Sequence, residues 1–183
     1  MQLINNSRDD NISELLKTDL NKGFRLVVEK YSSRLYWHIR RLVIIHEDAD
    51  DALQNTFINA WRSIGNFRSE STLYTWLYTI ATNEAFALIN KRKKNAAVSF
   101  DALDDFFTNS QEASTWFDGD EAQVKLQNAI LQLPDKQRIV FNLKYFDEMT
   151  YADMSKVLKT SEGALKASYH HAVKKIKNLI SKD

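Results

Sequence analysis

The sequence predicts an all-α protein made of two small helical domains joined by an acidic linker. Helices are favoured because only four of the 183 residues are Gly and one is Pro, too few for the many turns of a β-sandwich or barrel. The charge pattern indicates two domains, since residues 96–124 hold seven acidic residues and no Lys or Arg, between two mildly basic segments. We expect the domains over residues 1–95 and 121–183, with the linker over residues 96–120.

The composition also excludes several kinds of site. The chain contains no Cys, which excludes disulfides, thiolate zinc sites and a cysteine nucleophile. No apolar run approaches the ~20 residues of a membrane-spanning helix. The first residues likewise lack the apolar run of a signal peptide. We therefore expect a soluble, cytoplasmic protein, and the basic segments at both ends favour a polyanionic partner.

The first two helices are predicted from a cap and from apolar spacing. Residues 11–14, Asn-Ile-Ser-Glu, form a capping box that opens a short helix, and we expect Gly23 to end it. Apolar residues then recur every three or four positions over residues 24–45. This spacing predicts one long amphipathic helix.

The next two helices of the first half flank a polar loop. We expect Asp48 to cap the first of them, because an Asp side chain can accept a hydrogen bond from a free backbone N–H of the first turn. Its apolar face includes Phe57 and Trp61, and we expect both in the core. Residues 63–71 contain the loop-forming types, and residues 72–94 again show helical spacing.

The second half begins with a segment that has no sustained period, which is why we interpret residues 96–120 as a linker. Helices are predicted near residues 120–131 and 134–145, with Pro134 as the first residue of the latter. Thr150 and Ser161 are expected to cap two further helices that end near residues 158 and 180.

A short helix, a tight turn and a longer helix form the helix-turn-helix pattern of many DNA-binding proteins. The exposed face of the longer helix is predicted to carry Lys166, Ser168, His170 and His171. The major groove of DNA admits one helix, whose first turns reach the base edges. An ordinary helical hairpin with a solvated face has the same spacing, so both interpretations stay open at this point.

Four segments together resemble the bacterial extracytoplasmic-function sigma factors. Residues 48–61, DADDALQNTFINAW, resemble the family motif D-x-x-D-x-x-Q-x-T-F-x-x-A-W. Residues 67–83, FRSESTLYTWLYTIATN, resemble its next motif, F-R-x-x-S-x-x-x-T-W-L-x-x-I-A-x-N. The segments 133–138 and 151–166 resemble its fourth region. The four motifs occur in the family's order and cover most of the chain.

The resemblance implies a sigma factor that gives promoter specificity to RNA polymerase. Region 2 would dock on the polymerase clamp and melt the −10 element, region 4 would bind the flap and read the −35 element, and the linker would run through the polymerase interior. The implied partners are core RNA polymerase, promoter DNA and an anti-sigma factor, often one anchored in the membrane. No cofactor, metal ion, small-molecule substrate or catalytic residue is implied.

The resemblance also implies roles for particular residues. The implied contacts are Asp48, Asp51, Gln54 and Asn55 with core RNA polymerase; Phe67, Arg68, Ser69, Ser71, Tyr74 and Asn83 with the −10 element; and Lys144, Lys166, Ser168, His170 and His171 with the −35 element. The alternatives are purely structural roles. The first set would form a helix cap with a solvated face, and Phe67 would be a buried loop anchor. Tyr74 and Tyr78 are one turn apart and would either stack on unpaired bases or face a neighbouring helix.

The chain departs from the family pattern at several positions. Family members often have Arg at the positions of Ser168, His171 and Val173, so the preference for a −35 sequence does not carry over. Glu148 replaces a frequent Gly. The neighbouring His170 and His171 do not form a metal site, because adjacent helical residues point about 100° apart.

Three other functions compete with the sigma factor. A helix-turn-helix regulator would bind duplex DNA without polymerase, using its first domain to dimerise or to sense a ligand. An enzyme lacks support, since the sequence has no Gly-rich phosphate loop, no metal-ligand spacing and no Ser/His/Asp arrangement in a motif context. A helical adaptor would show no salt-dependent affinity for DNA.

Overall fold

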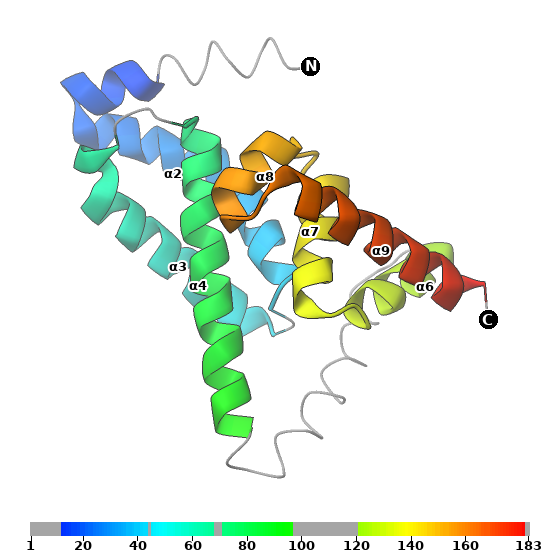
Figure 1. Ribbon diagram of the computed structural model, residues 1–183. Helices are drawn as coiled ribbons and strands as arrows, with labels where there is room; N and C mark the ends of the chain where they lie inside the picture. Colours follow the sequence, from blue (N-terminus) through cyan, green and yellow to red (C-terminus); the bar gives the residue numbers. More distant parts are fainter. Residues whose placement is uncertain (1–11, 44, 68–70, 97–120, 182–183) are drawn as a thin grey trace.

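The computed structural model describes residues 12–43, 45–67, 71–96 and 121–181. Within these residues the regular elements are all helical, which confirms the all-α prediction (Figure 1). After a helical stretch over residues 12–18, the elements are α2 (Leu20–Arg40), α3 (His46–Ser63), the short 3₁₀ helix η1 (Ile64–Asn66), α4 (Leu73–Ala96), α6 (Glu121–Leu131), α7 (Asp135–Tyr145), α8 (Tyr151–Leu158) and α9 (Glu162–Ile180). The expected linker lies almost wholly outside the described residues.

Side-chain caps start several of these helices. The Thr150 hydroxyl accepts a hydrogen bond from the Asp153 amide at 3.1 Å, and the Ser161 hydroxyl accepts one from the Ala164 amide at 3.4 Å, as predicted. The prediction for Asp48 was wrong, because α3 begins two residues earlier, at His46, and Asp48 lies in its first turn. Pro134 is the residue before α7 and not its first residue.

Gly23 does not end a helix, contrary to the prediction. It is a buried residue inside α2. The backbone of the preceding helical stretch, residues 12–18, passes very close to it. A Cβ atom at this position would lie 2.6 Å from the backbone nitrogen of Leu16 and 2.8 Å from the carbonyl carbon of Leu15. The absence of a side chain therefore permits two backbones to approach, which is a packing role and not a break.

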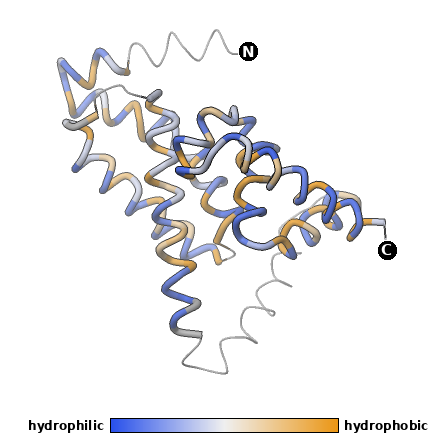
Figure 2. The backbone as a smooth tube through the Cα atoms, in the orientation of Figure 1, coloured by the Kyte–Doolittle hydropathy of each residue, from blue (hydrophilic) through white to orange (hydrophobic). Residues whose placement is uncertain are grey.

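Helices α2, α3 and α4 pack together as an N-terminal helical group. Each contributes a buried apolar stripe, and Figure 2 shows apolar residues recurring along these helices while the far end of α4 is hydrophilic. The expectation that Trp61 lies in the core was wrong, since 41% of it is exposed and its ring packs against Phe24 at 5.0 Å between centroids. Phe57 is half-buried against the core.

Helices α6 to α9 form a C-terminal helical group with an apolar cluster of its own. The cluster is built from buried residues of α6, α7 and α9 and the turn between the first two: Ala129, Ile130, Leu133, Phe141, Ala172 and Ile176. Helices α8 and α9 form the predicted helix-turn-helix. Its turn contains Lys159 in the left-handed conformation, with φ of 49°, and Glu148 before α8 has φ of 52°.

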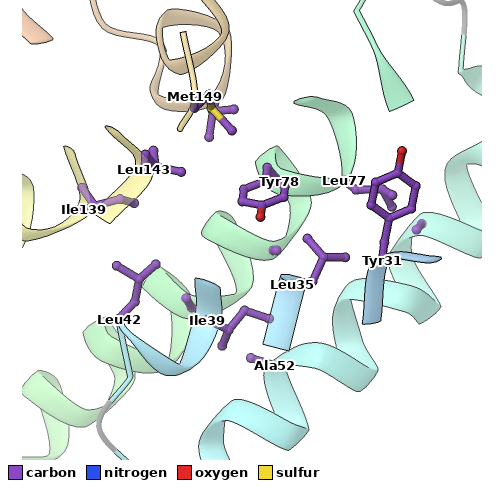
Figure 3. Close-up of a cluster of buried hydrophobic side chains, with 14 of the residues drawn as sticks. Tyr31, Leu35, Ile39, Leu42, Ala52, Leu77, Tyr78, Ile139, Leu143 and Met149 are labelled. Carbon is purple, nitrogen blue, oxygen red and sulfur yellow. The ribbon is translucent and has the colours of Figure 1, made fainter. Parts of the chain in front are cut away.

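The two helical groups share a second and larger core. Figure 3 shows Ile139, Leu143 and Met149 of the C-terminal group facing side chains of α2 and α4 such as Tyr78. In Figure 1, α8 lies against the part of α4 nearest its start, while the far end of α4 projects beyond the contact. The sequence predicted two domains but not this packing between them. The packing places the C-terminal group directly over one face of α4.

Candidate nucleic-acid interface

The outer face of α3 carries a row of exposed polar side chains. Asp51, Gln54 and Asn55 are exposed, and Ile58, one turn further on, is 46% exposed. Their spacing puts them on one face, opposite the buried residues Ala49, Ala52, Thr56 and Ala60. The structure thus brings three of the four candidate polymerase contacts together on a surface that no other described helix covers.

Asp48, the fourth candidate, has a different position. Its carboxylate forms an ion pair with Arg92 of α4 at 2.5 Å, and the Asp48 side chain is 16% exposed. The pair joins the start of α3 to the basic end of α4. This geometry supports a role for Asp48 in holding α3 and α4 together. The same carboxylate can also attract a basic partner surface.

The loop between α3 and α4 holds most of the candidate −10 contacts. Phe67 is half-buried, and its ring packs on Trp76 with 5.1 Å between centroids. This contact favours the loop-anchor alternative for Phe67 in the present arrangement. Ser71 is half-buried and its hydroxyl lies 3.4 Å from the Thr72 carbonyl oxygen. Asn83 is exposed on α4. Arg68 and Ser69 lie outside the described residues.

Tyr74 and Tyr78 form an aromatic pair with 4.3 Å between ring centroids. The pair is not exposed: Tyr78 is 1% exposed and Tyr74 is half-buried. The Tyr74 hydroxyl donates to the Asp147 carbonyl oxygen and the Tyr78 hydroxyl to Asp147 Oδ1, both at 3.2 Å. Of the two alternatives left open by the sequence, the structure has no free stacking surface here, and the pair faces the segment between α7 and α8.

Burial and the Asp147 charge change the acidity of both tyrosines. Burial, followed by the negative charge of Asp147, raises the pKa of Tyr74 to about 12. The same two causes raise the pKa of Tyr78 further. Both hydroxyls therefore stay protonated near neutral pH and act as hydrogen-bond donors.

Asp147 is the centre of a polar cluster that sequence reasoning missed. Its side chain is 5% exposed and receives a hydrogen bond from Arg41 at 2.8 Å between Nη2 and Oδ1. The buried His38 lies with Nδ1 3.1 Å from Asp147 Oδ2 and with Nε2 3.0 Å from the Thr82 hydroxyl. The buried carboxylate is thus compensated by a cation and by several donors. Its partners are about 70 to 110 residues away in sequence, so no local pattern reveals the cluster.

Two candidate −35 contacts meet at the helix-turn-helix. The ammonium groups of Lys144 and Lys166 lie 5.1 Å and 5.5 Å from the ring centre of Tyr151. Lys144 also donates to the Met149 carbonyl oxygen at 3.3 Å. Tyr151 is half-buried, and its ring lies beside both ammonium groups.

The exposed side of α9 carries the remaining candidates. Lys166 and His170 are exposed and spaced by four residues, so they share a face, and His171 is exposed beside them. Ser168 is half-buried. The opposite side of α9 buries Leu165, Ala172 and Ile176. Among the described residues, no group of three or more His, Asp or Glu side chains is arranged to hold a metal ion.

Comparisons with known proteins match both helical groups. The family model of sigma-70 region 2 matches residues 27–95, and that of sigma-70 region 4 matches residues 123–176. The sigma factor SigW of Bacillus subtilis, an extracytoplasmic-function RNA polymerase sigma factor, is 30% identical over 167 residues, which span 87% of this chain and 89% of SigW. The chain belongs to the extracytoplasmic-function sigma factors. It is an RNA polymerase sigma factor, and so a transcription initiation factor.

Other known proteins are similar to the chain in sequence or in fold. The sigma-H factor of Pseudomonas aeruginosa is 28% identical over 178 residues, 93% of this chain and 92% of that protein. The solved structure of CnrH in complex with the cytosolic domain of CnrY has the same fold, with a TM-score of 0.72 and 21% identity over 96% of this chain and 98% of CnrH. The sigma factor RpoE of Bartonella quintana, solved with the anti-sigma factor NepR, gives a TM-score of 0.69 and 22% identity over 88% and 99% of the two chains.

The matched regions of the sigma factor meet at the Asp147 cluster. Region 2 includes His38, Arg41 and both tyrosines, and region 4 includes Asp147. The shared core described above is therefore a contact between region 2 and region 4. Among the described helices of this sigma factor, none combines the length and the apolar character needed to cross a membrane.

Proposed function

We propose that this sigma factor binds core RNA polymerase through the outer face of α3, recognises the −10 and −35 promoter elements through regions 2 and 4, and helps to melt the DNA. The domain boundaries proposed are those expected from the charge pattern, 1–95 and 121–183, with 96–120 between them. The chain works by binding and not by catalysis, and it acts in the cytoplasm. The observation that carries the proposal is that exposed candidate residues lie on the same segments that match the two sigma-70 regions.

The polymerase contact is proposed for Asp51, Gln54 and Asn55. An exposed row of carboxylate and amide groups on a rigid helix can form several directional hydrogen bonds and attract a basic partner surface. Ile58 continues the row with an exposed apolar side chain that gains from burial. The ion pair of Asp48 with Arg92 holds the start of α3, and with it this surface, in place.

The −10 contact is proposed for Asn83 and for the loop residues before α4. The Asn83 amide is exposed and can both donate to and accept from a base edge. Phe67 and Tyr74 supply aromatic faces, although both are partly covered in the present arrangement. Stacking of unpaired bases on such faces contributes roughly 1–3 kcal/mol per base, which offsets the loss of stacking in the duplex.

The −35 contact is proposed for Lys144, Tyr151, Lys166 and His170. The two ammonium groups beside one tyrosine ring are suited to DNA phosphates, and the exposed face of α9 can enter the major groove. Ser168 and His171 complete the candidates. An ordinary helix-turn-helix regulator is not favoured, since it does not account for the match to region 2 over residues 27–95.

An anti-sigma factor is the further partner that we propose. Two solved structures of the same fold, those of CnrH and of the sigma factor RpoE, are each complexes with another protein, and the partner of RpoE, NepR, is named as an anti-sigma factor. The same kind of partner is expected to sequester this chain until a signal releases it.

The proposal is tested by run-off transcription with bacterial core RNA polymerase and a pool of genome fragments. We expect run-off transcripts whose production depends on the chain. Gln54→Ala and Asn83→Ala should each reduce the amount of these transcripts at least tenfold. Asn90→Ala, which removes an exposed Asn two turns further along α4, is the matched control and should initiate like the wild type. Specific binding to duplex DNA without binding to core polymerase would contradict the proposal.

A further inference from the structure

Two neighbouring histidines lie on the exposed side of α9. His170 and His171 are both exposed, and their ring centroids are 6.1 Å apart. The opposite side of the helix is buried and carries Leu165, Ala172 and Ile176. Adjacent helical residues point about 100° apart, so the two imidazoles leave the exposed side in different directions. This histidine pair can therefore contact a partner that covers the exposed side of α9.

Lysine side chains surround the histidine pair along the helix. Lys166 lies one turn before His170 and Lys174 one turn after it, while Lys175 lies one turn after His171. All three lysines are exposed. A row of cations on one side of a helix attracts a polyanion such as DNA. The histidine pair thus lies within a surface that already favours a phosphate-bearing partner.

No described acidic side chain forms an ion pair with either histidine. Each of the helices α6 to α9 contains one acidic residue. Each acid has another partner: Glu121 pairs with Lys125, Asp135 with Arg138 and Glu162 with Lys166, while Asp153 accepts hydrogen bonds from Thr150 and Thr75. Between α7 and α8, Asp147 binds residues of region 2, and Glu148 forms no ion pair with the histidines.

The other titratable groups near α9 are cationic or neutral. The helices that pack against it carry further cations, Lys136 and Lys144 on α7 and Lys156 on α8. Tyr169 precedes His170 in sequence, and its hydroxyl stays neutral because burial raises the pKa of Tyr169. A positive charge on either imidazole is therefore not neutralised by a neighbouring acid, and it can serve an anionic partner.

Protonation changes what an imidazole can bind. A neutral ring has one N–H donor and one acceptor, whereas a charged ring has two N–H donors and a positive charge. Histidine is the side chain type that changes charge between about pH 5 and 8. Guanine presents two acceptors in the major groove, and each phosphate carries a negative charge. The charged ring therefore suits both kinds of contact with DNA.

The place of the histidine pair on α9 brings it to the duplex. His170 lies one turn beyond Lys166, the proposed −35 contact, and on the same face. A helix in the major groove lies between the base edges and two phosphate backbones. Side chains that point about 100° apart can reach both. Positive neighbours disfavour protonation of an imidazole and phosphates favour it, so DNA binding and proton uptake support each other.

We propose that His170 and His171 take up protons when α9 binds duplex DNA, so that recognition of the −35 element strengthens as the pH falls. This inference rests on the proposed function and adds the proton as a second ligand. Linkage sets the sign, because a proton held more firmly in the complex makes the affinity rise at lower pH, with a slope of at most about one per histidine. Each charged ring that replaces a counterion also steepens the salt dependence by about 1.

The test measures the affinity of the full chain for duplex DNA by fluorescence anisotropy, at several pH values and salt concentrations. One labelled probe carries the −35 element of a promoter mapped by the run-off transcription, and the other is a duplex of random sequence. The double variant His170→Gln with His171→Gln keeps polar side chains that do not titrate. The double variant His170→Arg with His171→Arg carries two permanent charges. His46→Gln, which removes an exposed histidine of region 2, is the matched control.

The wild type and His46→Gln should bind the −35 duplex about 10- to 100-fold more tightly at about pH 5.5 than at about pH 8. Their slope of log affinity against log salt concentration should be steeper by about 1 to 2 at the lower pH. The double glutamine variant should keep the weak affinity of the wild type at high pH throughout. The double arginine variant should bind tightly throughout. Far-ultraviolet circular dichroism checks that each protein keeps its helices across the pH range.

Two results would overturn the inference. An affinity of the wild type that does not change with pH would show that no proton is taken up. An equal pH dependence in the wild type and the double glutamine variant would assign the protons to other groups, such as the buried His38. Failure of the proposed function gives a different result. The chain would then neither bind core polymerase nor start transcription, while its binding to the random duplex would still strengthen at low pH through the histidine pair.

Discussion

Arg41, the residue directly after α2, and Asp147, between α7 and α8, form an ion pair between region 2 and region 4 of this sigma factor, with 2.8 Å between Nη2 and Oδ1. Only 5% of the Asp147 side chain and 19% of the Arg41 side chain are exposed. A charge pair so far removed from water interacts more strongly than a surface pair, and its two members depend on each other.

The first prediction concerns the energy of this pair. In a double-mutant cycle of Arg41→Ala and Asp147→Ala, urea unfolding should give a coupling free energy of about 1.5–3 kcal/mol. The exposed pair of Arg25 and Glu29 within α2 is the control and should give about 0.5 kcal/mol or less. A coupling near zero for Arg41 and Asp147 would show that the two side chains do not depend on each other.

The second prediction concerns the ionisation of buried tyrosines. Absorbance at 295 nm should show a late ionisation of Tyr74 near pH 12, with Tyr78 later still. Because the pKa of Tyr74 is higher in the folded state than in the unfolded state, its contribution to stability is complete below about pH 10 and is lost as the pH rises toward 12.

The Asp147→Ala variant provides the control for this titration. Loss of the negative charge and of the covering segment should bring the late ionisation closer to pH 10, and Tyr74→Phe should remove one late step. An unchanged late phase in both variants would mean that other tyrosines are the buried ones.

The third prediction concerns the left-handed residue before α8. Glu148 has φ of 52°, a conformation that costs a non-glycine residue roughly 1–2 kcal/mol. Glu148→Gly should therefore raise the free energy of unfolding by about 1 kcal/mol, and Lys159→Gly should do the same at the end of α8. Lys156→Gly, inside α8, should instead lower it by about 1 kcal/mol. Equal destabilisation by all three changes would contradict the backbone assignment.

The fourth prediction concerns close packing at α2. Gly23→Ala should lower the free energy of unfolding by about 1–3 kcal/mol, because the new Cβ would overlap the backbone of Leu16. At Gly163 in α9 a Cβ meets no atom within 4 Å. Gly163→Ala should therefore stabilise the chain by about 0.5–1 kcal/mol in thermal unfolding. A neutral Gly23→Ala would mean that the two backbones are further apart.

The fifth prediction concerns the phosphate contacts of region 4. Lys144→Gln and Lys166→Gln should each weaken binding to duplex −35 DNA and reduce the slope of log affinity against log salt concentration by about 1. Lys22→Gln, which removes a 78% exposed cation of α2, is the control and should leave the slope unchanged. Unchanged slopes in both test variants would exclude these lysines from the DNA contact.

Local signals in the sequence predicted much of the fold. Thr150 and Ser161 cap α8 and α9 as expected, because a cap depends only on residues within one helical turn. The apolar spacing likewise predicted the buried face of α2. Trp61 was assigned to the core by the same spacing, but it lies at the edge of that face and stays 41% exposed.

Contacts between distant residues could not be predicted in this way. Asp147 and His38 are 109 positions apart, and neither belongs to a motif that indicates a partner. The Tyr74 and Tyr78 pair was expected to be exposed or to face a neighbouring helix, and only the packing of region 4 on α4 shows what covers it. The contact of Tyr151 with Lys144 and Lys166 joins three separate helices, so no local pattern indicates it.

The most direct test of the central claim is permanganate footprinting of promoter DNA. Permanganate oxidises unpaired thymines, so it detects melting around the −10 element. We predict reactive thymines only when core polymerase and the chain are both present, and their loss with Asn83→Ala but not with Asn90→Ala. Protection of duplex DNA by the chain alone, with no reactive thymine in the presence of core polymerase, would contradict the account.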